Sequence, residues 1–175
     1  MLGSLHPAIV HIPIGLLTLY AVLEILPLRR FFPADSLRLT KGILLVAGLL
    51  GAFFALQSGE AAGERSMEGY RLFETHAFFA GAMTWIFAAL AVLYIVAWLR
   101  PVMAPVVSGK QNTLVLLWNT ILRVSTTLDK DSIRRVVAFV GFIFLSFTGA
   151  LGGALVYGTQ ADPLISFVTR LLGVS

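Results

Sequence analysis

The chain contains no cysteine, and this absence removes a whole group of possible functions. Without a thiol there can be no disulfide, no thiolate metal site, no iron–sulfur cluster and no haem attached covalently through a C-x-x-C-H motif. Charged residues are also scarce, at 13% of 175 residues, whereas soluble domains carry about 25%. A chain with so few charges is not expected to fold as a water-soluble domain.

Long apolar segments take the place of the missing charges, and 58% of the residues are hydrophobic. Four apolar segments stand out, and crossing a bilayer core takes about 20 residues. Three of them are long enough alone, and the second, of 15 residues, must extend into its polar flanks. An alternating strand pattern, which a membrane barrel would need, is absent. The sequence therefore predicts an all-α membrane protein, a bundle of four transmembrane helices in a single domain over residues 1–175. The expected spans cover residues 8–28, 38–58, 76–99 and 135–157.

The basic residues are distributed unevenly between the two sides of these spans. Three lie on one side, namely Arg65, Arg71 and Arg170. Ten lie on the other side: Arg29, Arg30, Arg38, Lys41, Arg100, Lys110, Arg123, Lys130, Arg134 and Arg135. The positive-inside rule then predicts a bacterial inner-membrane protein with both termini outside. This bias also explains the net charge of +4, so nucleic acid is not expected as a partner.

Two shorter amphipathic segments are predicted to form helices at the membrane surface. The first covers residues 111–128, and its apolar positions recur at helical spacing. These positions are Leu114, Leu117, Trp118, Ile121, Leu122 and Leu128. The second covers residues 163–172 and begins with Asp162-Pro163, an N-cap followed by proline at the first helical position.

All three histidines are expected at one membrane depth, near the outer surface. His6 and His11 lie at the start of the first span, and His76 opens the third. We expect His6 to be the N-cap of the first helix, because Pro7 suits its first turn. Pro13 removes one backbone hydrogen bond and is expected to bend the helix beside His11.

The histidine faces suggest a haem site between the first and third spans. One turn below His11 lies Gly15, and one turn below His76 lies Ala80, so a flat macrocycle would find small residues beneath both imidazoles. Neutral imidazole is a good ligand for iron. We therefore expect His11 and His76 to hold one non-covalent haem b, with Arg71 as a partner for its carboxylates. The predicted function is electron transfer by a membrane b-type cytochrome-like subunit of a larger redox complex.

Other interpretations of the same residues stay open. A histidine at the bilayer interface can be an anchor, or can bind the Ile9 carbonyl that Pro13 frees, and small residues often serve helix packing. The main alternative is a haem-free docking subunit of a larger respiratory or photosynthetic membrane complex. A third is a quinone or small-ligand site with His11 and His76 as hydrogen-bonding groups. No nucleophile–base constellation or phosphate loop argues for hydrolytic or phosphoryl chemistry.

Glu24 is the one acidic residue set inside the first span, near its cytoplasmic end. Ionisable residues in membrane spans are expensive unless they are paired. We expect Glu24 to pair with Lys41 or Arg134, or else to extend towards the surface. A role in proton relay is the less favoured interpretation.

The motifs at the histidines resemble those of an uncharacterised bacterial family of four-span membrane proteins. That family has an N-terminal H-P-x-x-V-H-x-P-I motif, a histidine opening the third span and a G-G-x-L-V-Y sequence ending the last. Here these are residues 6–14, His76 and residues 152–157. The resemblance covers most of the chain except the enlarged 100–135 connection. It implies the four-span architecture and an expectation of haem binding.

The predicted orientation can be tested by cysteine labelling, because the chain has no cysteine of its own. With both termini and the 58–74 loop outside and the 100–135 connection inside, Ser66→Cys should react with an impermeant thiol reagent in intact cells. Ser108→Cys should react only after the membrane is opened. Labelling of Ser108→Cys alone in intact cells would invert the topology.

Overall fold

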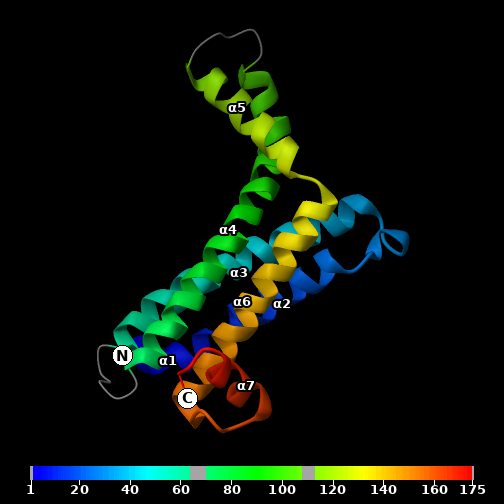
Figure 1. The fold of residues 1–175 in the computed structure, drawn as a ribbon. Helices are drawn as coiled ribbons and strands as arrows, with labels where there is room; N and C mark the ends of the chain where they lie inside the picture. The colour runs from blue at the N-terminus through cyan, green and yellow to red at the C-terminus, as the bar shows by residue number, and fades with distance from the viewer. Residues whose placement is uncertain (1, 64–69, 108–112, 175) are drawn as a thin grey trace.

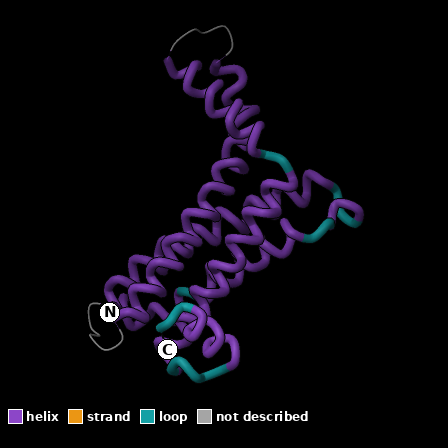
Figure 2. The backbone as a smooth tube through the Cα atoms, in the orientation of Figure 1, coloured by secondary structure: helices purple, strands orange, loops and turns teal. Residues whose placement is uncertain are grey.

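A computed structural model describes residues 2–63, 70–107 and 113–174; the two labelling positions, Ser66 and Ser108, lie outside these ranges. Within them the chain is helical apart from short connections, and no strand is present (Figure 2). The helices are α1 (Leu2–Ile9), α2 (His11–Ile25), the 3-10 turn η1 (Leu28–Arg30), α3 (Ala34–Gly63), α4 (Tyr70–Val107), α5 (Thr113–Leu128), α6 (Asp131–Tyr157) and α7 (Pro163–Leu171).

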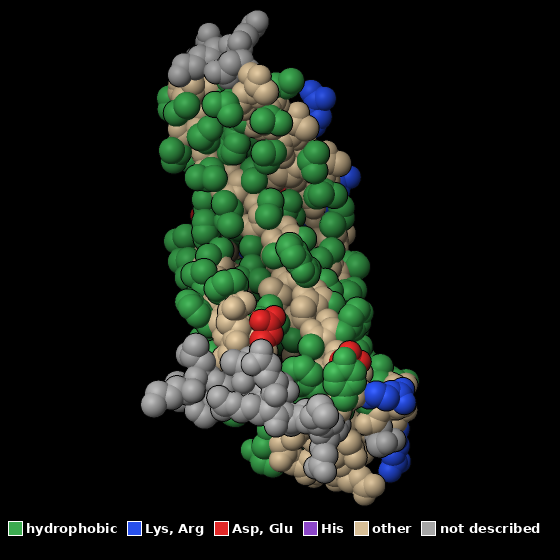
Figure 3. Space-filling view, turned by 90° about the vertical axis from the view of Figure 1, so that its left-hand side faces the viewer, with side chains coloured by type: hydrophobic (Ala, Val, Ile, Leu, Met, Phe, Trp, Pro, Cys, Tyr) green, Lys and Arg blue, Asp and Glu red, His purple; other side chains and the backbone are tan. Residues whose placement is uncertain are grey.

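Four helical stretches are long and apolar enough to cross a membrane. They cover His6–Ile25, Ala34–Glu60, Tyr70–Val107 and Asp131–Tyr157. In the face drawn in Figure 3, hydrophobic side chains cover most of the length of the molecule, and charged side chains lie towards its two ends. The predicted all-α membrane bundle is therefore confirmed.

The first span departs from its prediction at its start. Helix α1 begins at Leu2, so His6 lies inside a helix, and its prediction as an N-cap is wrong. A proline in such a short helix removes only one backbone hydrogen bond, which explains why α1 tolerates Pro7. One residue, Val10, separates α1 from α2, three residues before Pro13, and its backbone keeps the helical conformation. The bend expected beside His11 stays a prediction.

The spans form a bundle in which α2 and α4 are diagonal to one another. Helix α4 packs against α3 and α6, and α2 packs against the same two helices (Figure 1). The centre between α2 and α4 is filled by aromatic rings. Tyr20 of α2 meets Phe87 and Tyr94 of α4 edge-on, with ring centroids 6.0 and 6.1 Å apart. Leu17 and Leu45 are fully buried beside them.

Helix α4 extends beyond the bundle and forms a hairpin with α5 (Figure 1). It runs past the predicted end at residue 99 and contains Pro101 and Pro105. Each proline removes one backbone hydrogen bond, and the packing of α5 against α4 offsets that loss. The predicted helix over 111–128 is confirmed as α5, except for residues 111–112, which lie outside the described residues. Its position on the membrane surface stays a prediction.

Helix α7 covers the other end of the bundle and packs against α6 (Figure 1). The carboxylate of Asp162 accepts hydrogen bonds from the backbone N–H groups of Leu164 and Ile165, at 2.8 and 3.0 Å. The predicted N-cap is therefore confirmed. Ile165 and Val168 are buried against α6. We call this end of the bundle the histidine end, and the opposite end, where η1 and the starts of α3 and α6 lie, the basic end.

Glycines on α3 allow α2 to approach closely, and this packing can be tested. A Cβ atom at Gly48 would lie 2.7 Å from the side chain of Leu17, which is fully buried and has no room to move. Gly48→Ala should therefore lower the free energy of unfolding by about 1–3 kcal/mol. Reversible unfolding in mixed micelles measures the change.

Gly149→Ala of α6 is the matched control, because a Cβ atom there would meet nothing within 4 Å. Both substitutions gain the same intrinsic helix propensity, so their difference isolates the clash with Leu17. Equal stabilities of the two variants would mean that α2 and α3 do not pack at Gly48.

Candidate functional site

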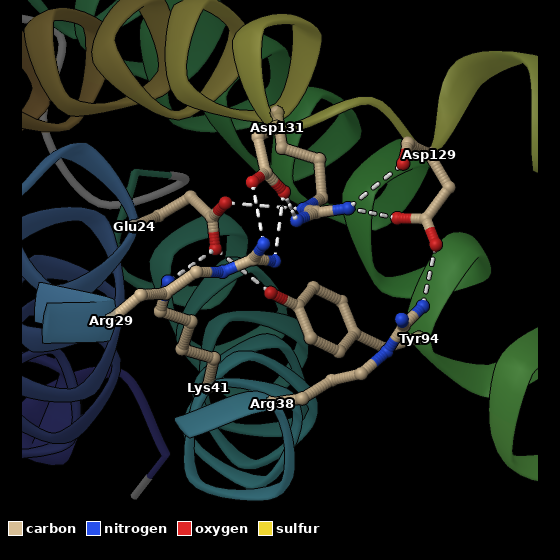
Figure 4. Close-up of polar contacts among 8 residues, drawn as sticks. Glu24, Arg29, Arg38, Lys41, Tyr94, Asp129 and Asp131 are labelled. Atoms are coloured by element: carbon tan, nitrogen blue, oxygen red, sulfur yellow. Dashed lines mark hydrogen bonds and ion pairs between the residues drawn. The ribbon is translucent and has the colours of Figure 1, made fainter. Parts of the chain in front are cut away.

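At the basic end, one buried carboxylate joins all four spanning helices (Figure 4). Glu24 of α2 is 2% exposed. One of its oxygens accepts a hydrogen bond from the Tyr94 hydroxyl of α4 at 2.8 Å and pairs with the Lys41 ammonium of α3 at 3.2 Å. The other oxygen accepts from Nε of Arg134, on α6, at 3.1 Å. We call these four residues the Glu24 clasp.

Two further carboxylates extend the clasp towards the surface. Asp129 and Asp131 both bind the guanidinium of Arg134. Asp129 also pairs with Arg38 of α3 at 2.5 Å, and Asp131 pairs with Arg29 of η1 at 2.7 Å (Figure 4). The loop between α5 and α6 is thereby tied to α3 and to the turn after α2.

The clasp has the chemistry of a structural ion cluster. Both Glu24 oxygens accept from cations, and the Tyr94 hydroxyl supplies a third donor, so the buried charge is fully paired. Pairing of this kind offsets the cost of removing a carboxylate from water. The expected pairing of Glu24 is confirmed with both candidate partners, Lys41 and Arg134, rather than with one of them.

At the histidine end, His6 lies half-buried between α1 and α3. Its Nδ1 is 2.9 Å from the Ser58 hydroxyl, which itself donates to the Ala55 carbonyl. Because that hydroxyl proton is already used, Nδ1 of His6 is the donor, and the neutral ring keeps its lone pair on Nε2. The ring lies against Gly59, where a Cβ atom would come within 3.1 Å of it.

His76 of α4 is held in the same way by α6. Its Nδ1 lies 3.1 Å from the Thr148 carbonyl oxygen. A carbonyl can only accept, so Nδ1 carries the proton and Nε2 again keeps the lone pair. The ring rests on Gly152, at 3.2 Å from the position that a Cβ atom would take.

The other residues expected at the haem site do not share one surface of the bundle. Ala80 is buried one turn below His76, as the helical spacing predicts. Arg71 is exposed in the first turn of α4. His11 and Gly15 lie on an exposed face of α2, and a Cβ atom at Gly15 would meet nothing within 4 Å.

The structure does not bring His11 and His76 together within this chain. Five residues separate His6 from His11, about 140° around a helix, so His11 turns outwards when His6 faces α3. The aromatic rings of Tyr20 and Phe87 fill the centre between the diagonal helices α2 and α4. His6 and His76, in contrast, both face neighbouring helices.

Sequence reasoning missed the groups that hold the two histidines. Ser58 is a hydroxyl residue at the end of an apolar segment, followed by glycine, and Thr148 stands four residues before Gly152 on α6. The available signal was a hydroxyl residue close to a glycine on α3 and on α6. The sequence does not say which histidine each of these residues meets, because that depends on how each helix is rotated about its axis.

Among the described residues, no three histidine, aspartate or glutamate side chains are grouped to hold a bare metal ion. Haem needs only one or two protein ligands, because its macrocycle supplies the other nitrogens. Comparisons with protein-family models, curated proteins and solved structures find no match to the chain. The resemblance to the four-span family therefore stays a prediction.

We expect the loss of a buried ion pair in the Glu24 clasp to lower the free energy of unfolding much more than the loss of an exposed ion pair. Glu24→Gln leaves Arg134 and Lys41 buried without their shared anion, and removal of one partner of a buried pair typically costs about 3–5 kcal/mol. We expect about 3 kcal/mol of lost unfolding free energy, because Arg134 keeps Asp129 and Asp131. Reversible unfolding in mixed micelles measures it.

Arg29→Gln is the control, because the Arg29–Asp131 pair is exposed, with 54% and 39% of the two side chains accessible. Exposed pairs contribute at most about 1 kcal/mol. If Glu24→Gln and Arg29→Gln lowered the free energy of unfolding by the same small amount, the Glu24 clasp would not be the main stabilising interaction at the basic end.

Proposed function

We propose that this protein is a membrane electron-transfer subunit that binds one haem b at its histidine end, with His76 and His6 as the iron ligands. The pair differs from the one expected from sequence alone, because His11 faces outwards from α2. With the positive-inside orientation, the haem would lie near the outer face of a bacterial inner membrane.

The observation that carries the proposal is the shared state of the two imidazoles. In both rings Nδ1 donates to an oxygen of a neighbouring helix, and Nε2 keeps its lone pair. Histidines that bind metal are commonly arranged in this way, with the second ring nitrogen donating to a carbonyl or carboxylate that fixes the ring. Both rings thus offer Nε2 at the same end of the bundle, as the two axial ligands of one haem iron would.

The chain's own residues would orient and surround the group. Ser58 and the Thr148 carbonyl set the two ring orientations, and Gly59 and Gly152 let the rings lie close to α3 and α6. Arg71, which is exposed in the first turn of α4, would bind the haem carboxylates. Bound haem would supply a one-electron couple, whose potential depends on the axial ligands and on burial.

A second function, docking to a larger membrane complex, is favoured by the exposed face of α2. His11 is exposed there beside Ile12, which is 61% exposed. An ionisable side chain within a membrane span usually faces protein or water rather than lipid. A partner subunit packed on this face of α2 would cover His11. The two functions are compatible, because His6 and His76 are held against neighbouring helices, whereas His11 is exposed.

Absorption spectra of the purified protein, oxidised and then reduced with dithionite, test the haem proposal. The wild type should show a Soret band with sharp reduced α and β bands. His76→Ala and His6→Ala should each abolish or convert this low-spin spectrum, since each removes one axial imidazole. His11→Ala, the matched control, should leave the spectrum unchanged.

Three results would contradict the proposal. A folded wild type without haem bands, prepared from cells that make haem, would remove its basis and favour the docking function. Loss of the spectrum in His11→Ala but not in His6→Ala would restore the ligand pair expected from sequence. Spectra that survive every histidine substitution would leave the haem without a protein ligand.

A further inference from the structure

A pocket of about 290 Å³ opens between α3, α4 and α5 at the basic end. Its wall includes Arg38 of α3, Trp98 and Arg100 of α4, and Leu122, Ser125 and Thr126 of α5. The volume lies near the lower end of small-ligand pockets, about 300–1,000 Å³. It is separate from the histidine end and plays no part in the proposed haem site.

The charge around this pocket favours an anion. Asp129 is its one acidic wall residue, and that carboxylate is already bound by Arg38 and Arg134. Arg100 makes no ion pair or hydrogen bond with any residue in the described ranges. Four cations face three carboxylates in the adjoining network, and Arg100 adds a fifth cation. An incoming anion would therefore find two arginines and a net positive charge.

A hydroxyl in the pocket wall supplies a neutral donor. Ser125 is 7% exposed, and its hydroxyl makes no hydrogen bond within the described part of the chain. The neighbouring Thr126 hydroxyl, by comparison, donates to the Arg123 carbonyl at 3.0 Å. Two guanidinium groups and a free hydroxyl donor suit the oxygens of a phosphate group.

The pocket also lies at the level where the helices leave the apolar layer. Arg100 is the first charged residue after the apolar run of α4, and Arg38 stands just before that of α3. Val96, Ala97 and Trp98, whose ring packs over Gly42, give the pocket an apolar wall on the side of the spans, because they precede Arg100 on α4. Tryptophan is enriched at this level of membrane proteins, where lipid headgroups lie.

From this combination we propose that the pocket binds the phosphate group of an anionic phospholipid. Arg100 and Arg38 pair with the phosphate oxygens, and the Ser125 hydroxyl donates to one of them. The acyl chains then follow the apolar wall of Val96 and Trp98 along α4 into the bilayer. Basic pockets between transmembrane helices on the cytoplasmic side bind anionic headgroups elsewhere by the same chemistry.

Fluorescence quenching of Trp98 tests this site. Trp85→Phe and Trp118→Phe leave Trp98 as the one tryptophan, and the full-length protein is placed in vesicles with brominated acyl chains. Brominated phosphatidylglycerol should quench Trp98 more strongly than brominated phosphatidylcholine at equal mole fraction. Arg100→Gln should weaken the phosphatidylglycerol preference about fivefold, as expected for the loss of one basic contact near a membrane surface. Ser125→Ala should weaken it less.

The control is Arg123→Gln, because Arg123 is exposed on α5 and is not part of the pocket wall. Arg123→Gln should keep the phosphatidylglycerol preference. If basic residues attracted anionic lipid only in a general way, both arginine variants would lose this preference equally, and the site would be overturned.

Equal quenching by the two lipids in the wild type would also overturn the site. Loss of the preference in millimolar inorganic phosphate would overturn the lipid assignment and make free phosphate the ligand. Circular dichroism checks that each variant is folded.

Discussion

The pairing of Glu24 is the interaction on which the basic end of the bundle depends. A carboxylate that is 2% exposed inside an apolar bundle is tolerated only when cations and donors surround it. Its partners come from the three other spanning helices, so the rotation and height of each must be right at the same time. Apolar packing alone is non-directional and would allow small shifts among these helices. The clasp removes that freedom at one level of the bundle.

The two ends of the bundle are held by different chemistry, and this difference separates their roles. The basic end is closed by ion pairs that bind the carboxylates of Glu24, Asp129 and Asp131 within the chain. The histidine end is closed by neutral hydrogen bonds, in which His6 and His76 each use one ring nitrogen and keep the other. Glycines of α3 and α6 permit the close approach of these rings. The two ends therefore offer different ligands: unused imidazole nitrogens at the histidine end, and the Arg100 guanidinium in the pocket at the basic end.

The long helix α4 connects these two regions. His76 stands near its start, Tyr94 joins the clasp, and Arg100 lines the pocket beneath α5. A lipid bound at Arg100 would rest on the same hairpin that Asp129 ties to α3 and α6. The proposed lipid site would thus secure the projecting hairpin, whereas the proposed haem site lies at the opposite membrane surface.

Much of the fold could be predicted because its signals are local. Four apolar runs, the Asp162-Pro163 cap and the spacing of Leu114, Leu117 and Ile121 each define a helix from neighbouring residues alone. The ends of the helices were harder to predict, because packing between helices decides where each one stops. Helix α4 continues through Pro101, and α1 begins before Pro7. Local rules treat those prolines as boundaries, but a neighbouring helix can offset one lost hydrogen bond.

The candidate site divides in the same way between sequence and tertiary structure. By itself, the sequence determined that three histidines gather at one end, that His76 shares a face with Ala80, and that Glu24 needs Lys41 or Arg134. Only the tertiary structure decided that His6 rather than His11 faces the bundle, and that Ser58 and Thr148 hold the rings. The reason is physical: helical period relates residues within one helix, whereas the rotation of each helix about its axis is set by its contacts with the others.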